Sequence, residues 1–201
     1  MAPASGVAGK WERLSWIYYD SEPYVSGQVQ YTFFRNVTTK TATQTNMRLS
    51  AAIPAPQHFK VFAVWIHVAL GVLTTAGPPT TWTAMTIGEL ETWQAGRFIF
   101  VVSNKPLLEM PIWKLPSGGG VYCDGDVTGN STPARLDFAQ DSLASPLHVY
   151  RLFRPINITP VENFYAQLDY TTAPSGSTGA GGANPTRITV GLEGILRRGI
   201  Q

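Results

Sequence analysis

The sequence predicts an all-β fold, a sandwich or a barrel, and three observations lead to this prediction. Short runs rich in Val, Ile, Thr, Phe, Tyr and Trp are separated by frequent breakers, with 19 Gly and 15 Pro in 201 residues. Several of these runs alternate apolar and polar side chains, which is the period of a half-buried strand. Hydrophobic residues make up 44% of the chain, which is enough for one domain with a substantial core.

The first two predicted strands depend on this alternation. In Gln28–Val37, every second residue from 29 to 33 is apolar, and the residues between them are polar. In Asn46–Ile53, every second residue from 47 to 53 is apolar. We expect both segments to be strands with one face in the core.

Residues His58–Leu70 form a longer predicted strand that is apolar on nearly both faces. This composition is typical of a strand in the middle of a sheet. Its most apolar part, Val61–Leu73, is shorter than the roughly 20 residues of a membrane-spanning helix and contains His67. We therefore expect a buried strand rather than a membrane span.

The segment Arg97–Trp113 predicts two strands joined by a turn at Asn104–Lys105. The first of them, Arg97–Ser103, is apolar almost throughout. The second contains Pro111, which has no N–H for a ladder hydrogen bond, so we expect an edge strand or a bulge there.

Three later segments complete the predicted sheets: Pro146–Ile156, Val161–Thr172 and Thr186–Arg198. In the second, the even-numbered residues from 164 to 170 are apolar or aromatic and alternate with the odd-numbered ones. The total is about eight or nine strands, with no internal repeat.

Signals for helices are few. Thr86–Gly96 is the strongest candidate because Gly96 could end a helix, and Asp137–Ser145 could form one further turn. The Gly-, Ser- and Ala-rich segment Ala173–Pro185 cannot pack a core, so we expect a flexible surface loop.

We expect one domain, residues 28–198, preceded by an N-terminal arm, residues 1–27, and followed by a tail, residues 199–201. The first ten residues lack the basic and long apolar regions of a secretory signal. The arm is rich in aromatic residues, so we expect it to pack on the sandwich or on a neighbouring subunit. Exposed aromatic side chains could also stack on sugars, which favours a lectin-like sandwich as the alternative. The aromatic residues are Trp11, Trp16, Tyr18 and Tyr19.

The charge content is low and favours an oligomer. Charged residues make up 14% of the chain, where about 25% is usual for soluble domains. So few charges solvate the surface of a monomer poorly, unless Thr, Ser and Gln do so instead. The net charge is +2 and the only basic cluster is Arg197–Arg198, which is not the footprint of a dedicated nucleic-acid binder. The single Cys123 excludes an internal disulfide framework and a cysteine-rich zinc site.

The stretch Leu115–Asn130 resembles several ligand-binding loops but satisfies none of them. It has neither the lysine of a phosphate loop nor the third glycine of a dinucleotide fingerprint. Asp124 and Asp126 match the first two ligand positions of a calcium loop, but Arg135 stands where a carboxylate is required. A weak calcium site at these two aspartates stays open. We expect a connection without strands from Ser117 to Ser145, whose Gly118, Gly119 and Gly120 allow close approach at a subunit contact.

No constellation of residues predicts catalysis. The sequence contains no nucleophile elbow and no zinc-protease motif, and its histidines, His58, His67 and His148, show no metal-binding spacing. Distant carboxylate pairs stay open, but nothing singles out two of the 13 acidic residues. We expect no enzyme, no cofactor and no small-molecule substrate.

The organisation from Gln28 to Arg198 resembles the jelly-roll coat proteins of icosahedral viruses, especially tailless phages. The resemblance lies in "AAIPAPQHFKVFAVWIHV", in the hairpin-like "FIFVVSNKPLLEMPIWKLPSGGG" and in "ITVGLEGILRRGIQ". It implies an eight-stranded jelly-roll sandwich of two four-stranded antiparallel sheets that assembles into trimers or pentamers with other virion proteins. The length suits a single jelly roll. The implied location is the virion, after synthesis in the host cytoplasm.

The expected function is therefore that of a capsid subunit, and the alternative is a receptor- or carbohydrate-binding spike or fibre head. Arg197 and Arg198 would face genome or lipid headgroups, or pair with Glu12 or Asp20 of a neighbouring subunit. The expected interface residues are Trp11, Trp16, Tyr18, Tyr19, Gly118, Gly119, Gly120, Arg197 and Arg198.

Overall fold

The computed structural model describes residues 11–23, 25, 27–69, 95–115, 121–124, 138–141, 149–172 and 187–199. In this part of the chain, eight strands form two four-stranded antiparallel sheets, and two further strands form a separate short pair. The described helical structure is one 3-10 turn, η1, Ile112–Lys114. The predicted all-β class and the two four-stranded antiparallel sheets are confirmed.

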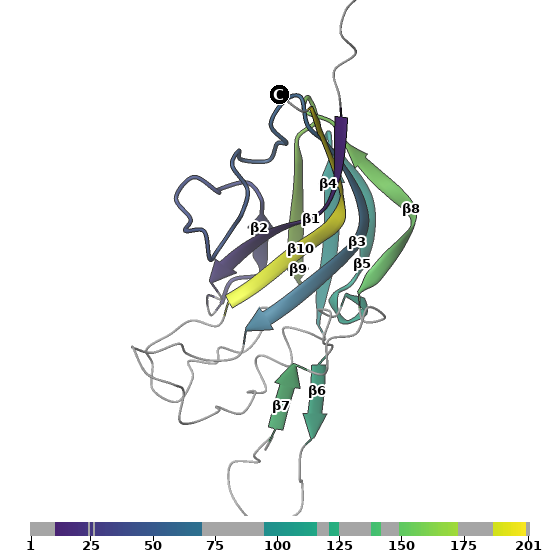
Figure 1. Cartoon of the computed structure of the whole chain (residues 1–201). Helices are drawn as coiled ribbons and strands as arrows, with labels where there is room; N and C mark the ends of the chain where they lie inside the picture. The colour runs from purple at the N-terminus through teal and green to yellow at the C-terminus, as the bar shows by residue number, and fades with distance from the viewer. Residues whose placement is uncertain are drawn as a thin grey trace, which may run out of the picture.

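The first sheet has the strand order β1-β10-β3-β8. Strand β3 lies inside this sheet, as its apolar composition predicted, and β1 and β8 form the edges (Figure 1). The four strands are β1 (Trp11–Pro23), β10 (Arg187–Gly199), β3 (His58–Ala69) and β8 (Tyr150–Ile158).

The second sheet has the strand order β2-β9-β4-β5. Strand β5 lies at its edge, which agrees with the position of Pro111, and a tight turn at Ser103 and Asn104 joins β4 to β5. Both turn residues have positive φ, 49° and 63°, a conformation that asparagine tolerates better than most residues. The four strands are β2 (Gln30–Phe33), β9 (Phe164–Tyr170), β4 (Gly96–Val102) and β5 (Lys105–Pro111).

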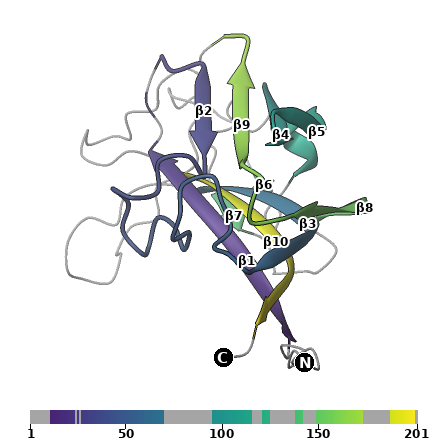
Figure 2. The ribbon, with the colours of Figure 1, turned by 90° about the horizontal axis from the view of Figure 1, so that it is seen from above.

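The two sheets face each other as layers, and the core lies between them (Figure 2). The alternation predicted for β9 is present, because its even-numbered residues are buried and its odd-numbered residues are half-exposed. The largest fully buried side chains are mostly aromatic: Tyr31, Phe33, Phe34, Phe59, Phe98, Phe100 and Phe164.

The predicted N-terminal arm is wrong for residues 11–23. These residues pair with β10 along their whole length, from Trp11 opposite Gly199 to Pro23 opposite Arg187, so the described part of the sandwich already includes Trp11, well before Gln28 (Figure 1). The period-two pattern explains this outcome, because Leu14 and Tyr18 pack on the core from one face of the strand. The C-terminal boundary moves by one residue, since β10 includes Gly199.

The strand predicted for Asn46–Ile53 is also wrong, since these residues form turns and isolated bridges. Ala51 has a φ of 54°, and its backbone N–H donates to the Phe34 carbonyl at 2.6 Å instead of joining a ladder. Strand β2 is shorter than predicted for a related reason. It ends at Phe33 because Phe34 adopts a φ of 69° and turns the chain out of the sheet.

The connection from Ser117 to Ser145, predicted to lack strands, contains β6 (Val121–Asp124) and β7 (Phe138–Asp141), which pair with each other. The short pair lies beyond one end of the sandwich (Figure 1). Strand β7 therefore lies within Asp137–Ser145, the segment predicted as a possible helical turn. Pairing with β6 satisfies backbone groups that a single helical turn leaves free. Most of the predicted helix Thr86–Gly96 and the predicted loop Ala173–Pro185 lie outside the described residues.

Candidate interface at the end of β1 and β10

The structure places four of the predicted interface residues along the first half of β1 and the end of β10, two on each face of the sheet. The residues are Trp11, Trp16, Arg197 and Arg198, and we call this group the strand-end site. Trp11 and Trp16 are 41% and 39% exposed, so both keep large apolar area in contact with solvent. Tryptophan and arginine are the residue types that dominate binding energy in protein interfaces.

The arginines of the strand-end site contact residues of the same chain. The guanidinium of Arg197 lies 4.5 Å from the centre of the Trp11 ring, and the Nε of Arg198 donates to Glu12. Glu12 and Arg198 are opposite one another in the register of β1 and β10. Arg198 therefore pairs with Glu12 of its own chain, whereas we expected this pair between neighbouring subunits.

Trp16 forms one wall of a small groove beside β1. The groove also includes apolar residues of the turn segment 46–54 and Leu196 of β10, and its volume is about 70 Å³. Sites for drug-sized ligands usually measure roughly 300–1,000 Å³. The groove therefore suits one protruding side chain of a partner better than a whole small molecule.

Tyr18, which was predicted as an interface residue, lies in the core instead. It is 5% exposed, and its ring meets the ring of Phe59 edge-to-face at a centroid distance of 4.9 Å. Burial raises the pKa of the Tyr18 phenol above its ordinary value of 10.0, and the nearby Arg48 guanidinium opposes this change. The correction follows from strand geometry, because Tyr18 is on the inward face of β1 and Tyr19 on the outward face.

We expect Tyr18 to ionise at a higher pH than an exposed tyrosine. Since the neutral phenol is favoured in the folded state, its stabilising contribution is complete below pH 10.0 and is lost as the pH rises through the folded pKa. Absorbance near 295 nm, recorded during alkaline titration of the wild type and of Tyr18→Phe, measures this step. If the ionisation step that disappears in Tyr18→Phe lies at or below pH 10.0, the assignment is contradicted.

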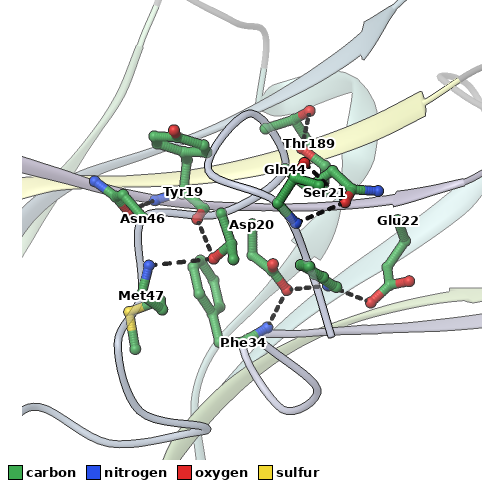
Figure 3. A network of polar contacts seen from close by, with 12 residues as sticks. Tyr19, Asp20, Ser21, Glu22, Phe34, Gln44, Asn46, Met47 and Thr189 are labelled. Atoms are coloured by element: carbon green, nitrogen blue, oxygen red, sulfur yellow. Dashed lines mark hydrogen bonds and ion pairs between the residues drawn. The ribbon is translucent and has the colours of Figure 1, made fainter. Parts of the chain in front are cut away.

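Tyr19 and its neighbours fasten the chain segment 40–47 along the free edge of β1 (Figure 3). The backbone N–H of Tyr19 donates to Asn46 Oδ1 at 3.0 Å, and Asn46 Nδ2 donates to the Ile17 carbonyl at 2.6 Å. Thr45 Oγ1 donates to the Tyr19 carbonyl at 3.0 Å. Tyr19 is therefore used within the chain, and this half of the edge is closed to further strands.

Toward Trp11, the same edge of β1 has no such cover among the described residues. A bare strand edge can accept main-chain hydrogen bonds from a second chain. Together with the exposed rings of Trp11 and Trp16, this makes the beginning of β1 suitable for a subunit contact.

The remaining predicted site residues cannot be assessed in the same way. Gly118, Gly119, Gly120 and Asp126 lie outside the described residues. The backbone of Asp124 lies in β6, opposite Phe138, so this residue belongs to a strand pair rather than to an open calcium loop. Where side chains are described, no three His, Cys, Asp or Glu residues gather closely enough to hold a metal ion.

A second polar site lies on the outer face of the second sheet. Arg97 on β4 donates to Glu109 on β5 at 3.0 Å and to Asp169 on β9 at 3.2 Å. Burial by itself would raise the pKa of Asp169, but hydrogen bonds from Gln167, Gln30 and Arg97 lower it below its ordinary value. A hollow of about 690 Å³ lies beside these residues, bordered by Met110 and Pro111 as well.

Sequence reasoning missed the most exposed large apolar residue of the described chain, Phe153 in β8, which is 98% exposed. The register explains its position. Strand β3 pairs Val61 with Ile156 and then Ala63 with Arg151, so the residues of β8 between them bulge away from the sheet. Pro155, directly before Ile156, was the available signal for such a bulge.

Comparison with protein-family models finds no family that matches this chain, and no curated protein is significantly similar in sequence. Within the described residues there is also no helix with the length and apolar character required to cross a bilayer. The functional interpretation therefore depends on the geometry of the chain itself.

Proposed function

We propose that the chain is a single jelly-roll capsid subunit that assembles through the edges of its sandwich. The observation that carries the proposal is the pairing scheme of the eight sandwich strands. The first pairs with the last, the second with the seventh, the third with the sixth, and the fourth with the fifth: β1 with β10, β2 with β9, β3 with β8, and β4 with β5.

A chain that pairs like one long hairpin folded over onto itself is what we expect of a jelly roll of eight strands in two sheets, so this scheme supports the proposal. Jelly rolls occur in viral capsid proteins and in lectins, so the fold alone leaves both functions open. The choice between them depends on the surface.

The surface favours assembly. Both edge strands of the first sheet carry exposed aromatic side chains, Trp11 and Trp16 on β1 and Phe153 on β8. A contact between β8 of one subunit and β1 of the next would use two different patches, and such heterologous contacts close into rings when the rotation permits. The groove beside Trp16 has the size for one side chain of a neighbour. Membership of a virion and contact with other virion proteins belong to this proposal.

Mass photometry of the full chain over a range of concentrations tests the proposal. We expect rings or closed shells for the wild type, and subunits or small species for Phe153→Ser. The Phe153 side chain is 98% exposed in the single chain, so its removal should leave folding intact. Val161→Ser, at another highly exposed apolar position, is the matched control and should assemble as the wild type does. A wild-type chain that stays monomeric at all concentrations would contradict the proposal.

A glycan- or receptor-binding head is the second candidate, and the hollow beside Arg97 favours it. Its volume is within the range of ligand sites, and Arg97, Glu109 and Asp169 present the charged planar groups that bind sugar hydroxyls. Calorimetric titration with a panel of oligosaccharides decides between the two. Saturable binding that Arg97→Ala abolishes, by a chain that stays monomeric, would support this function instead.

A further inference from the structure

The outer face of the first sheet brings together cations that are far apart in the sequence. The register places Arg13 of β1 opposite Arg197 of β10, and Arg197 opposite the first residue of β3. Lys60 follows on β3, one outward position farther along the strand. Neighbouring strands lie about 5 Å apart and outward positions along one strand about 7 Å apart, so these groups form one compact patch.

These cations have few counter-charges. Arg13, Lys60 and Arg197 form no ion pair with any described residue, and Lys60 and Arg197 instead lie 5.4 and 4.5 Å from the aromatic rings of Phe62 and Trp11. The one carboxylate that strand alternation places on this face within the described strands is Glu193. Glu12 is on the other face, where it binds Arg198.

An apolar group borders the cations. Ile17 of β1, Ile195 of β10 and Phe62 of β3 are 44%, 37% and 37% exposed, and they lie on three adjacent strands. Phe62 is at the irregularity of the register where β3 is one residue longer than β10. Ile17 and Ile195 are diagonal neighbours across β1 and β10, and Glu193 lies directly opposite Ile17. Single exposed apolar residues are ordinary, whereas several close together favour a binding surface. We call these six residues, Arg13, Ile17, Lys60, Phe62, Ile195 and Arg197, the basic-apolar face.

We infer that the basic-apolar face docks on the surface of an anionic lipid bilayer. Acidic headgroups would neutralise the three cations, and the ring of Phe62 and the two isoleucines would enter the boundary between headgroups and acyl chains. This geometry is that of a protein lying on a membrane, and it requires no spanning helix.

Two other occupants fit the observations less well. Single-stranded nucleic acid would satisfy the cations, and its bases could stack on Phe62 or Trp11, but they would gain little from the aliphatic side chains of Ile17 and Ile195. A second copy bound face to face would place the cations of both copies against each other, with only Glu193 to offset them. The inference uses the outer face of the first sheet, whereas the proposed assembly uses the sheet edges, and Arg197 is the one residue that belongs both to this face and to the strand-end site.

Co-sedimentation with vesicles of phosphatidylcholine, with and without 30% phosphatidylglycerol, tests the inference. We expect the wild type to bind the anionic vesicles and hardly to bind the neutral ones. Each cation near an anionic surface contributes about fivefold in affinity, so the combined variant Arg13→Gln, Lys60→Gln, Arg197→Gln should bind about a hundredfold more weakly. The variant Ile17→Ser, Ile195→Ser should lose the binding that persists in high salt, because that part is apolar.

The matched control removes three cations elsewhere, with Arg35→Gln, Lys105→Gln and Lys114→Gln, and should keep nearly all of the affinity. Circular dichroism and thermal unfolding confirm that each variant folds. Equal losses in the two triple variants, or equal binding to neutral vesicles, would overturn the inference. So would a single-stranded oligonucleotide that displaces the protein from vesicles through these three cations, because nucleic acid would then be the occupant. Mass photometry of the same variants shows separately whether the chain assembles, so that failure of the membrane inference and failure of the assembly proposal can be distinguished.

Discussion

Replacing Asp20 by alanine is expected to lower the free energy of unfolding by about 3–5 kcal/mol. Asp20 is fully buried, and its Oδ2 accepts a hydrogen bond from the Phe34 N–H at 2.6 Å (Figure 3). The same oxygen accepts a second hydrogen bond from Lys40 Nζ at 2.7 Å. Alanine would leave a buried backbone donor without its acceptor and would take one of two carboxylates away from a largely buried ammonium. The second carboxylate is that of Glu22, which accepts from Lys40 at 2.6 Å.

The effect should extend beyond one ion pair, because Asp20 connects three parts of the fold. It lies in β1, Phe34 follows the end of β2, and Lys40 begins the segment that covers the edge of β1. The Oδ1 atom of Asp20 is buried without a hydrogen-bond partner among the described residues, so part of the ion-pair energy already offsets this cost. We therefore expect the variant to loosen the segment 34–47 before it unfolds globally.

Urea unfolding, followed by hydrogen exchange of the same variant, measures both effects. Glu22→Gln is the matched control, since it removes the more exposed partner of the same lysine and should cost about 1 kcal/mol or less. Combining Asp20→Ala with Lys40→Met should recover part of the loss, because the double variant no longer buries an ammonium group. A cost for Asp20→Ala no larger than for Glu22→Gln would show that the network does not carry this stability.

Most of the strands could be predicted from the sequence because one face of each is buried against the opposite sheet. Strand β9 is the clearest case, since its alternating burial is visible in the alternating residue types. Asn46–Ile53 has the same alternation but forms turns, with the Ala51 carbonyl accepting from the Phe164 N–H at 2.9 Å. Four alternating apolar residues can also cover the end of a sandwich from a loop, and the sequence alone does not separate these two cases.

The candidate sites were less predictable, because they depend on register. The aromatic group near the N-terminus and the pair Arg197–Arg198 could each be predicted as interface residues from the sequence. The contact between Trp11 and Arg197 could not, because it requires β1 and β10 to pair. Nothing in the sequence singles out Arg13 or Lys60, since each is an isolated cation. Only the pairing of three strands places them side by side.

Gly194→Ala is expected to lower the free energy of unfolding by about 3 kcal/mol. A Cβ atom at this position would lie 2.1 Å from the Lys60 carbonyl oxygen and 2.9 Å from the ring of Phe59. Both distances are far below a van der Waals contact, and the closer atom belongs to the backbone of β3, so a side-chain rotation cannot relieve the clash. The glycine is at the register irregularity between β10 and β3, which places it where the two backbones approach each other.

The added methyl group would therefore have to separate β10 from β3, the two central strands of the first sheet. Thermal and urea unfolding of Gly194→Ala should show the loss, and Gly199→Ala provides the control in the same strand. A Cβ at position 199 would meet only Pro56, at an ordinary 3.9 Å, so that variant should change stability by about 0.5 kcal/mol or less. Equal stability of the two variants would mean that β10 and β3 do not approach as closely at Gly194 as the structure places them.

The basic-apolar face depends on the same contact, because Arg197 and Lys60 lie on these two strands. Gly194→Ala should thus weaken binding to anionic vesicles without changing any of its residues.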